Sequence, residues 1–332
     1  MTLSIICPTY NEERYIAQTI ESFVKQKFHS FDLEILICDG MSTDKTREIV
    51  KSFSEKSPNI ILVDNPERKT PFAFNAGLRQ ASGEFVAILG AHTKYADNYL
   101  QVCYEELIKS GSVGCTGRVI TKAAFDNYEA KISEWIMLST FGVSTSSFRA
   151  MKEGYAHSVN FPVFRKQALL DLGGYNTAME RNQDNDMNQR LLDAGHKLYC
   201  TWKTKCFYRP PANLKSLFNY ACRNGFWNAK SIMVNARSMR LHHLIPFIFT
   251  TAIITLGLGS IVEFALFQTP YFLILLGMII SLHLLLGIVF SIRSLKYEND
   301  GRKIILPFIF FAFHFSYGWG TLTGFLKGKG SK

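Results

Sequence analysis

Two polar segments near the start of the chain carry side chains that could bind one ligand together. The first contains Asn11 and Glu12, and the second contains Asp39 and Asp44. A helical pattern begins after each segment, and the N-terminus of a helix favours a negatively charged group. If both segments lie at one edge of the fold, the chemistry they indicate is the binding of a polar ligand with an anionic part.

Each polar segment follows a short apolar run that is typical of a β-strand. Residues 4–7 and 33–38 are mainly apolar and partly β-branched, as expected for strands buried on both faces of a sheet. Helical patterns follow at 13–27 and 44–53, and this alternation predicts a parallel sheet. Ligand sites of such sheets lie at the carboxyl ends of the strands, where both polar segments occur. The four polar residues should therefore converge on one crevice.

The elements expected further along the chain continue this α/β pattern. A turn with the sequence Gly90-Ala91-His92 follows the fourth strand and should lie at the same edge of the sheet. We predict one α/β domain over residues 1–212. The other expected elements are strands at 60–63, 85–89, 158–164 and 196–202, and helices at 71–80, 97–109, 166–172, 184–194 and 214–240.

Positive charge is concentrated in front of an apolar tail. The chain carries a formal net charge of +10, and eight basic but no acidic residues fall within 200–242. An amphipathic, basic and aromatic segment of this kind suits a membrane interface, so we assign residues 213–242 to interface helices. A membrane surface is therefore the expected partner, and nucleic acid is not.

Residues 243–332 are predicted to be a membrane region. Segments at 244–267, 271–292 and 304–326 are nearly free of charge and reach the roughly 20 residues that a membrane helix needs. The basic segment and the positive loop 293–303 should both lie in the cytoplasm, which predicts a multi-pass protein of the inner membrane with its α/β domain in the cytoplasm. Three full spans would place the basic C-terminal tail outside, so the sequence leaves open whether the third segment spans, lies in the interface or re-enters.

Several short motifs in a fixed order resemble a known family. The chain is similar to the inverting family 2 glycosyltransferases of the GT-A fold, in particular to the succinoglycan-biosynthesis ExoA type. The resemblance implies a GT-A (nucleotide-diphospho-sugar transferase) domain, a nucleotide-diphosphate sugar as donor, in particular a UDP-sugar, and a lipid-linked or polysaccharide acceptor. The motifs that carry it are at residues 6–12, 38–44, 75–78, 173–175, 181–191, 223–227 and 314–318.

The same resemblance implies roles for individual residues. Asp184 would be the catalytic base, because inverting transfer needs a carboxylate to take the proton of the acceptor hydroxyl. A helix cap or first-turn acid is the alternative for Asp184. The residues implied in binding the nucleotide-sugar are Pro8, Thr9, Asn11, Glu12, Asp39, Ser42, Asn75, Gly90 and His92.

Four more residues are candidates for contacts with the acceptor or the diphosphate. They are Arg181, Asp186, Arg223 and Trp227. Asp186 could equally be a solvated first-turn charge, and residues 223–227 could be an interfacial aromatic-basic anchor. Arg68 and Lys69 could also supply positive charge to a diphosphate, or could be surface charges.

The chain departs from the family pattern where a metal would be expected. Similar proteins carry an aspartate at the position of Gly90, and a glutamate at that of Gln183. A divalent metal, Mg²⁺ or Mn²⁺, is implied by the resemblance, but only His92 is left as a candidate ligand. A single imidazole suits manganese better than magnesium, and His92 could instead donate a hydrogen bond to phosphate.

Two functions follow from these observations. The first is a membrane-anchored inverting glycosyltransferase that adds one sugar at the cytoplasmic face. The second, motivated by the missing carboxylates, is a catalytically degenerate member that binds nucleotide-sugar or serves as an assembly component of a polysaccharide-biosynthesis complex.

Overall fold

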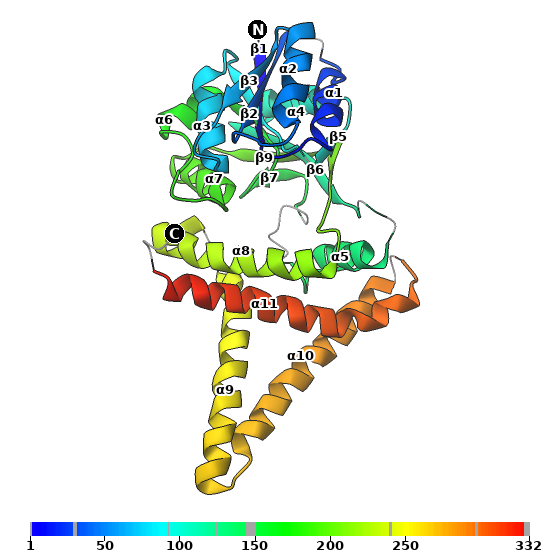
Figure 1. Cartoon of the computed structure of the whole chain (residues 1–332), viewed down its shortest axis with the longest axis vertical. Coiled ribbons are helices and arrows are strands. Elements are labelled where there is room, and N and C mark those ends of the chain that lie inside the picture. Colours follow the sequence, from blue (N-terminus) through cyan, green and yellow to red (C-terminus); the bar gives the residue numbers. More distant parts are fainter. Residues whose placement is uncertain are drawn as a thin grey trace. The chain divides into compact units, whose positions relative to one another are not determined.

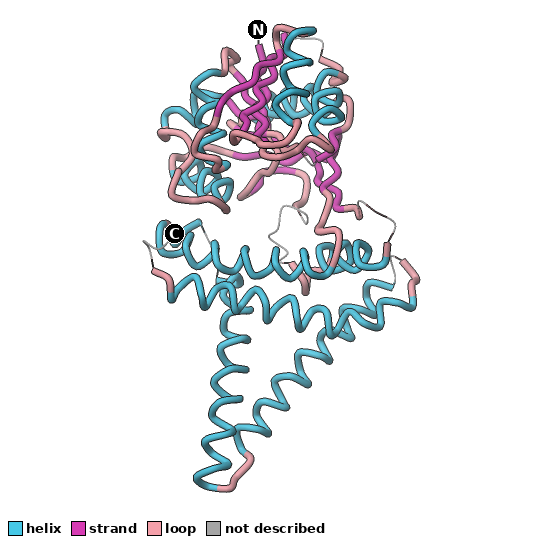
Figure 2. Tube along the Cα trace, viewed as in Figure 1, coloured by secondary structure: helices cyan, strands magenta, loops and turns pink. Residues whose placement is uncertain are grey.

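The chain folds into two units, shown in Figure 1. The computed structural model describes residues 2–28, 32–91, 93–123, 125, 127–143, 151–238, 241–295 and 298–328. The first unit comprises residues 1–120 and 148–208, and the second comprises 121–147 and 209–332. The strands gather in the first unit and the second is helical (Figure 2).

One mixed sheet organises the first unit. Among the described residues its strand order is β3-β2-β1-β4-β8-β6-β9-β5, and β7 pairs with β9. The four strands from β3 to β4 are parallel, which confirms the predicted α/β sheet, and β8 then pairs antiparallel with both β4 and β6. The strands are β1 (Thr2–Thr9), β2 (Asp32–Asp39), β3 (Ile60–Asp64), β4 (Phe85–Ile88), β5 (Thr93–Tyr95), β6 (Gly114–Thr121), β7 (Gly154–Ala156), β8 (Val163–Arg165) and β9 (Leu198–Tyr208).

Helices cover both faces of this sheet. Side chains alternate along β1, so Leu3 and Ile5 enter one core while Ile6 enters the other. The first core is shared with α1 (Ile16–Val24), α2 (Thr46–Lys56) and α4 (Tyr99–Ser110). The second core is shared with α3 (Thr70–Gln80), α6 (Lys166–Asp171) and α7 (Gln183–Asp193).

The register of the parallel strands aligns their polar ends. Thr9 at the end of β1 lies opposite Asp39, and Asp39 lies opposite Asp64 at the end of β3. Ile88 in β4 lies opposite Ile6, so Gly90 follows β4 at the same edge. The carboxyl ends of four strands therefore meet at one edge, as the sequence predicts.

The second unit consists of helices. They are α5 (Tyr128–Leu138), α8 (Leu214–Val234), η2 (Ala236–Ser238), η3 (Leu241–Leu244), α9 (Ile245–Phe267), α10 (Tyr271–Leu295), η4 (Gly301–Ile305) and α11 (Leu306–Leu326). The helix expected to reach residue 240 ends at Val234. Residues 244–267 and 271–292, expected as apolar helices, correspond to α9 and most of α10.

Helix α5 belongs to the second unit, although the sequence analysis places residues 1–212 in one domain. Trp135 and Ile136 of α5 share a buried core with Leu217 of α8 and Phe310 of α11. The indole nitrogen of Trp135 also donates to Glu298 Oε2 at 2.7 Å. The two units differ from the predicted domains because α5 buries its apolar face against helices far away in the sequence.

Helices α9 and α10 form a hairpin joined by residues 268–270 (Figure 1). The acidic residue of α9, Glu263, accepts hydrogen bonds at the turn from the backbone nitrogens of Phe272, at 2.8 Å, and Tyr271, at 3.2 Å. It thereby satisfies donors at the start of α10 that have no partner within the helix. The charge that interrupts the apolar run is therefore used to cap the next helix.

Candidate functional site

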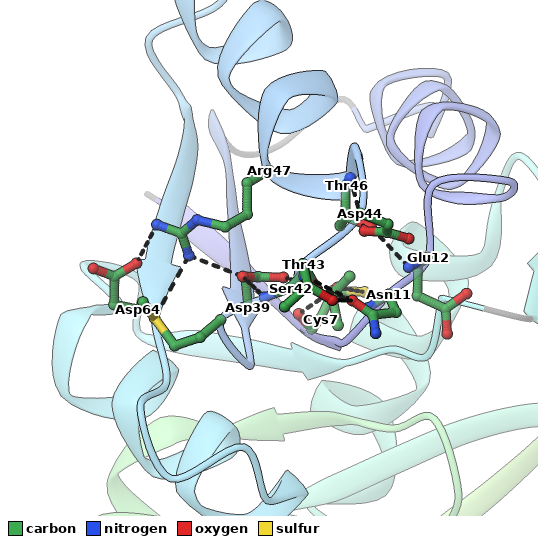
Figure 3. A network of polar contacts seen from close by, with 12 residues as sticks. Cys7, Asn11, Glu12, Asp39, Ser42, Thr43, Asp44, Thr46, Arg47 and Asp64 are labelled. Carbon is green, nitrogen blue, oxygen red and sulfur yellow. Dashed lines mark hydrogen bonds and ion pairs between the residues drawn. The ribbon is translucent and has the colours of Figure 1, made fainter.

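The two polar turns after β1 and β2 are hydrogen-bonded to each other (Figure 3). Asn11, which has a left-handed φ of 53°, donates from its backbone nitrogen to Ser42 Oγ at 2.8 Å. Its side-chain oxygen accepts from Thr43 N at 2.9 Å. The Gly40 amide donates to the Thr9 carbonyl at 2.8 Å. The structure thus brings together Thr9, Asn11 and Ser42, three residues implicated by the sequence.

Asp44 joins the beginnings of α1 and α2. Its Oδ1 accepts from Thr46 N at 3.0 Å and its Oδ2 accepts from Glu13 N at 3.1 Å. Partial desolvation alone would raise the pKa of Asp44, but the hydrogen bonds from Thr46 and Glu13 outweigh it and the pKa is lowered. The neighbouring amide of Glu12 donates to Thr46 Oγ1 at 2.7 Å. Asp44 therefore supplies the negative charge that these helix N-termini favour.

Asp39 is completely enclosed at the end of β2. Its side chain has no exposed surface, and its Oδ2 accepts from Ser42 N at 2.9 Å and from Arg47 Nη1 at 2.8 Å. Its Oδ1 accepts from Ser42 Oγ. The second Arg47 nitrogen pairs with Asp64 Oδ1 at 2.8 Å, and the Asp64 side chain is 59% exposed. Asp39 thus holds the turn that carries Ser42, while Asp64 presents the exposed carboxylate (Figure 3).

Sequence reasoning missed both Arg47 and Asp64. A signal for Asp64 was available, because it ends β3 as Asp39 ends β2. The local sequence around Arg47 does not separate it from a surface charge of α2, and only its tertiary contacts with Asp39 and Asp64 do so.

Asn75 on α3 is engaged with the loop that follows α6. Its amide nitrogen donates to the Tyr175 carbonyl at 2.8 Å, and its oxygen accepts from Tyr175 N at 2.7 Å. Gly174 has a φ of +76°, and a Cβ there would lie 2.6 Å from Asn75 Oδ1. The amide group of Asn75 therefore fixes this loop. The sequence analysis predicts that Asn75 binds the nucleotide-sugar and does not predict this structural role.

Asp186 is buried and paired. Its Oδ2 accepts from Arg190 Nε at 2.9 Å, and 1% of the residue is exposed. The same guanidinium donates to the carbonyls of Leu172 at 2.9 Å and Gly174 at 2.8 Å. Asp186 is thus neither a solvated charge nor an open carboxylate in the structure, because it anchors the arginine that closes this loop.

Asp184 stands in the first turn of α7. Its Oδ1 accepts from Asn185 N at 2.9 Å, and this contact with a backbone N–H of the first helical turn agrees with the first-turn-acid alternative. Its Oδ2 accepts from Asn160 Nδ2 at 2.6 Å, which capping does not explain. Burial raises the pKa of Asp184, and these two hydrogen bonds oppose the rise only in part. The carboxylate therefore binds a proton more readily than an ordinary aspartate does.

Gly90 follows β4 and has space beside it. Its backbone nitrogen donates to the Tyr95 hydroxyl at 2.8 Å. A Cβ at Gly90 would lie 3.4 Å from Phe161 Cε1, an ordinary packing distance. The backbone conformation and the space at Gly90 would therefore accept a residue with a side chain. The fold does not require glycine here, so a carboxylate is absent only because the sequence has none at this position. His92, the predicted metal ligand, lies outside the described residues.

The described residues do not fit a protein-bound metal ion. Among them no three His, Cys, Asp or Glu side chains come together as a ligand set. Gly90 contributes no oxygen ligand from a side chain, and Asp39 is already saturated by Ser42 and Arg47. Hard divalent ions need several oxygen ligands, which this part of the chain does not assemble.

The remaining candidates lie at several places. Pro8 is partly exposed and Thr9 is buried at the end of β1. Lys69 pairs with Glu180 at 2.7 Å. Arg68 lies in the loop between β3 and α3, and Arg181 lies two residues before the start of α7. Arg223 and Trp227 lie on α8 in the second unit, four residues apart on one side of that helix.

Comparison with known proteins identifies the family of these motifs. The model described as Glycosyl transferase family 2 matches residues 4–169, half of the chain. A dolichyl N-acetyl-α-D-glucosaminyl phosphate 3-β-D-2,3-diacetamido-2,3-dideoxy-β-D-glucuronosyltransferase of Methanococcus voltae is 28% identical over 335 residues, which cover 98% of each chain. The succinoglycan biosynthesis protein ExoA of Rhizobium meliloti is 27% identical over 245 residues, 73% of each chain.

A solved structure matches nearly the whole fold. The mannosyltransferase PcManGT of Pyrobaculum calidifontis, in complex with GDP-Man and Mn²⁺, superimposes with a TM-score of 0.63 at 20% identity. The match covers 96% of this chain and 86% of the other. The fold is accordingly a GT-A-like α/β domain followed by three apolar helices, as the resemblance implies.

Proposed function

The chain belongs to glycosyl transferase family 2, and from this premise we propose that it transfers one sugar, with inversion, from a nucleotide-diphosphate sugar to a lipid-linked acceptor. The Methanococcus relative, named as a transferase to a dolichyl phosphate sugar, supports a lipid-linked acceptor because it is similar over almost its whole length. We propose a UDP-sugar as the donor and the cytoplasmic face of the inner membrane as the place of reaction.

The environment of Asp184 is the observation that carries the proposal. Burial raises its pKa, and Asn160 holds its Oδ2 at 2.6 Å. In the proposed reaction the acceptor oxygen bonds to the anomeric carbon while Asp184 accepts the hydroxyl proton. The bond from that carbon to the diphosphate oxygen breaks on the opposite face, which inverts the configuration. A raised pKa improves a carboxylate as a base for an alcohol proton.

We place the nucleoside of the donor at the joined turns after β1 and β2. Backbone and side-chain groups of Asn11 and Ser42 hold this surface in one conformation before any ligand binds. Preorganisation of this kind lowers the entropic cost of binding. Asp64 is the exposed carboxylate of this edge and is our candidate for a direct nucleoside contact.

A divalent ion is proposed only as a companion of the donor diphosphate. PcManGT is in complex with Mn²⁺, and this motivates a test for the ion here. The described residues assemble no ligand set for it, so the steps attributed to Asp184 do not depend on an ion. His92 is the residue we propose to face the diphosphate.

Sugar transfer by membranes that contain the chain tests the proposal. Labelled UDP-sugars and GDP-sugars are supplied with and without a chelator, and wild type is compared with Asp184→Asn. We expect the variant to lose about 10²-fold or more in turnover, since positioned acid-base groups contribute factors of this size. Asp186→Asn, which removes the charge that pairs with Arg190, controls for disturbance of α7. Full activity of Asp184→Asn would remove this residue as the base, and nucleotide binding without turnover in wild type would favour the assembly component.

We further propose that α9 and α10 cross the membrane as a hairpin. Both are long and apolar enough to span, and only 6% and 11% of their most apolar segments are buried within the chain. Large apolar side chains such as Leu258, Ile261 and Leu285 are exposed along them. An apolar surface of this extent is unfavourable in water and suits the hydrocarbon core of a bilayer.

Helix α11 is a third candidate span, but its packing supports a different location. In its most apolar segment 44% of residues are buried, chiefly because α11 lies along α8 (Figure 1). Side chains added at Gly320 or Gly324 would collide with the α8 backbone. Three pairs of residues make contact along the two helices: Cys222 with Gly320, Phe226 with Gly324, and Lys230 with Gly328. The members of each pair are 98 residues apart in the sequence, so the two helices run parallel.

This parallel contact supports a common layer for α8 and α11. Lys215 and Arg223 are exposed on α8, and a helix with such charges is costly to bury in hydrocarbon. Phe308, Trp319 and Leu326 form an exposed apolar series on α11. We propose that both helices lie in the membrane interface, so that the chain crosses the membrane twice and its basic tail stays on the cytoplasmic side.

A reporter at the C-terminus tests this topology. Protease should remove a C-terminal tag from inverted inner-membrane vesicles and spare it in intact spheroplasts. Insertion of the same tag into the loop 268–270 is the matched control and should behave in the opposite way. Protection of the C-terminal tag in inverted vesicles would mean that α11 spans.

A further inference from the structure

The loop between β7 and β8 delivers Asn160 to Asp184. The Asn160 side-chain nitrogen donates to Asp184 Oδ2 at 2.6 Å, across 24 residues of sequence. An amide nitrogen can only donate, so this contact favours the carboxylate over the protonated acid. Among the described residues, Asn160 is the one side chain that the structure shows donating to Asp184.

Four elements hold this loop in place. The carbonyl of Asn160 accepts from Thr116 Oγ1 on β6, and that of Phe161 accepts from the Tyr99 hydroxyl on α4 at 2.8 Å. The carbonyl of Val159 accepts from Asn188 Nδ2 on α7 at 3.1 Å. The carbonyl of Pro162 accepts from the backbone of β4 at 3.0 Å. Asn160 therefore has little freedom to follow Asp184 if the carboxylate moves, and it can impose an orientation.

The backbone next to Asn160 is strained. Phe161 has a φ of 58°, a left-handed conformation that is unfavourable for a bulky side chain. Its ring lies 3.4 Å from the position of a Cβ at Gly90, so the loop also reaches the end of β4. Strain that the surrounding structure maintains is found mainly at functional sites. Here the turn at Phe161 is what directs consecutive residues toward the end of β4 and toward Asp184.

We infer that Asn160 is a positioning residue for sugar transfer, which fixes the orientation of the Asp184 carboxylate and keeps it ready to accept a proton. The inference rests on the proposed role of Asp184 as the base. Asn160 itself does not exchange a proton with the substrate. It opposes the effect of burial, which alone would leave Asp184 protonated and inactive over more of the pH range.

The other titratable groups around Asp184 do not replace this contact. Tyr175, from the loop after α6, has a pKa raised far above its usual value by burial, so it stays neutral. Asp186 and Arg190 of the same helix neutralise each other at 2.9 Å. In a plot of transfer rate against pH, the acidic limb is the part where the rate falls as the pH is lowered. A shift of this acidic limb can therefore be assigned to Asp184 and its hydrogen-bond donors.

The pH dependence of single-turnover sugar transfer tests the inference. Asn160→Ala removes a hydrogen bond to the charged form of Asp184. The acidic limb should therefore move to higher pH by about one pH unit, and the rate at a pH below the limb should fall roughly tenfold. Asn160→Asp keeps the size of the side chain but places two carboxylates together, so it should raise the limb further. Asn188→Ala, which removes a brace of the same loop without touching Asp184, is the matched control and should leave the limb where it is.

Each outcome separates the inference from the proposed function. A limb at the wild-type pH in both Asn160 variants would overturn the positioning role, even when Asp184→Asn is inactive. Full activity of Asp184→Asn would instead overturn the role of Asp184 as the base. The acidic limb would then not report on Asp184, and the Asn160 variants would not shift it. If Asn160→Ala does not fold, the isosteric Asn160→Asp carries the test, since its transfer rate and its nucleotide affinity are measured on the same preparation.

Discussion

Replacing Arg47 by methionine should weaken nucleotide binding even though Arg47 need not touch the ligand. Its guanidinium donates to the fully enclosed Asp39 at 2.8 Å, and Asp39 in turn holds the backbone and hydroxyl of Ser42. Methionine keeps much of the aliphatic volume but leaves a buried carboxylate without its cation. The turn after β2 then loses the charge balance that keeps it closed.

The size of the effect follows from the burial of the two partners. Removing one member of a fully buried ion pair costs about 3–5 kcal/mol. Arg47 is 23% exposed and Asp39 keeps two hydrogen bonds from Ser42, so we expect a smaller cost than for a fully buried pair, about 2–3 kcal/mol. If about half of this falls on the turn that binds the nucleotide, Kd rises about tenfold, which corresponds to roughly 1.4 kcal/mol.

Titration calorimetry of the detergent-solubilised chain with UDP and GDP measures this change. Lys51→Met is the matched control, because it removes an exposed cation from the same helix, α2, and should cost less than about 0.5 kcal/mol. Adding Asp39→Asn to Arg47→Met should restore part of the affinity, since the uncompensated charge disappears. Equal effects of Arg47→Met and Lys51→Met, or no rescue in the double variant, would refute the account of Asp39 as a buried anchor.

Three further predictions concern stability and metal binding. Gly225→Ala should lower the thermal midpoint in detergent by several degrees, because its Cβ would collide with the Tyr317 carbonyl, whereas Gly257→Ala, with nothing within 4 Å, should not. Gly90→Asp should tighten Mn²⁺ binding in the presence of UDP about tenfold by titration calorimetry, since the site has space for the side chain and lacks an oxygen ligand; unchanged affinity would place the ion elsewhere. Asp184→Asn should unfold at a higher temperature than wild type at pH 8 and at the same temperature at low pH: a raised folded pKa means that ionisation opposes folding as pH rises, and a lower midpoint at pH 8 would contradict the raised pKa.

The converging polar turns could be predicted because strand polarity alone decides where they lie. Apolar runs at 4–7 and 33–38, each followed by a helical pattern, imply parallel neighbours, and parallel strands end at one edge. The register that aligns Thr9, Asp39 and Asp64 agrees with that expectation. The role of each side chain at the edge could not be predicted, because Asp39 and Asp64 have the same sequence setting and opposite exposure.

The segments 114–121 and 128–138 show where sequence patterns were insufficient. Strand β6 is rich in glycine and threonine and lacks a clear alternation, so nothing in it predicts a central strand. Helix α5 has a weakly one-sided pattern, and most of its apolar residues are buried against α8 and α11. Both elements form because distant parts of the chain cover them, which overrides weak local preference.

By itself, the sequence determined the family, the α/β class, the likeness of the polar turns to a ligand site and the presence of three apolar helices, because these depend on local periodicity and on the order of motifs. The tertiary structure alone decided which polar groups are enclosed and which are open. It seals Asp39 behind Arg47, pairs Asp186 with Arg190 and brings Asn160 to Asp184. These outcomes depend on desolvation and on hydrogen bonds between residues far apart in the chain, and such contacts leave no periodic trace in the sequence.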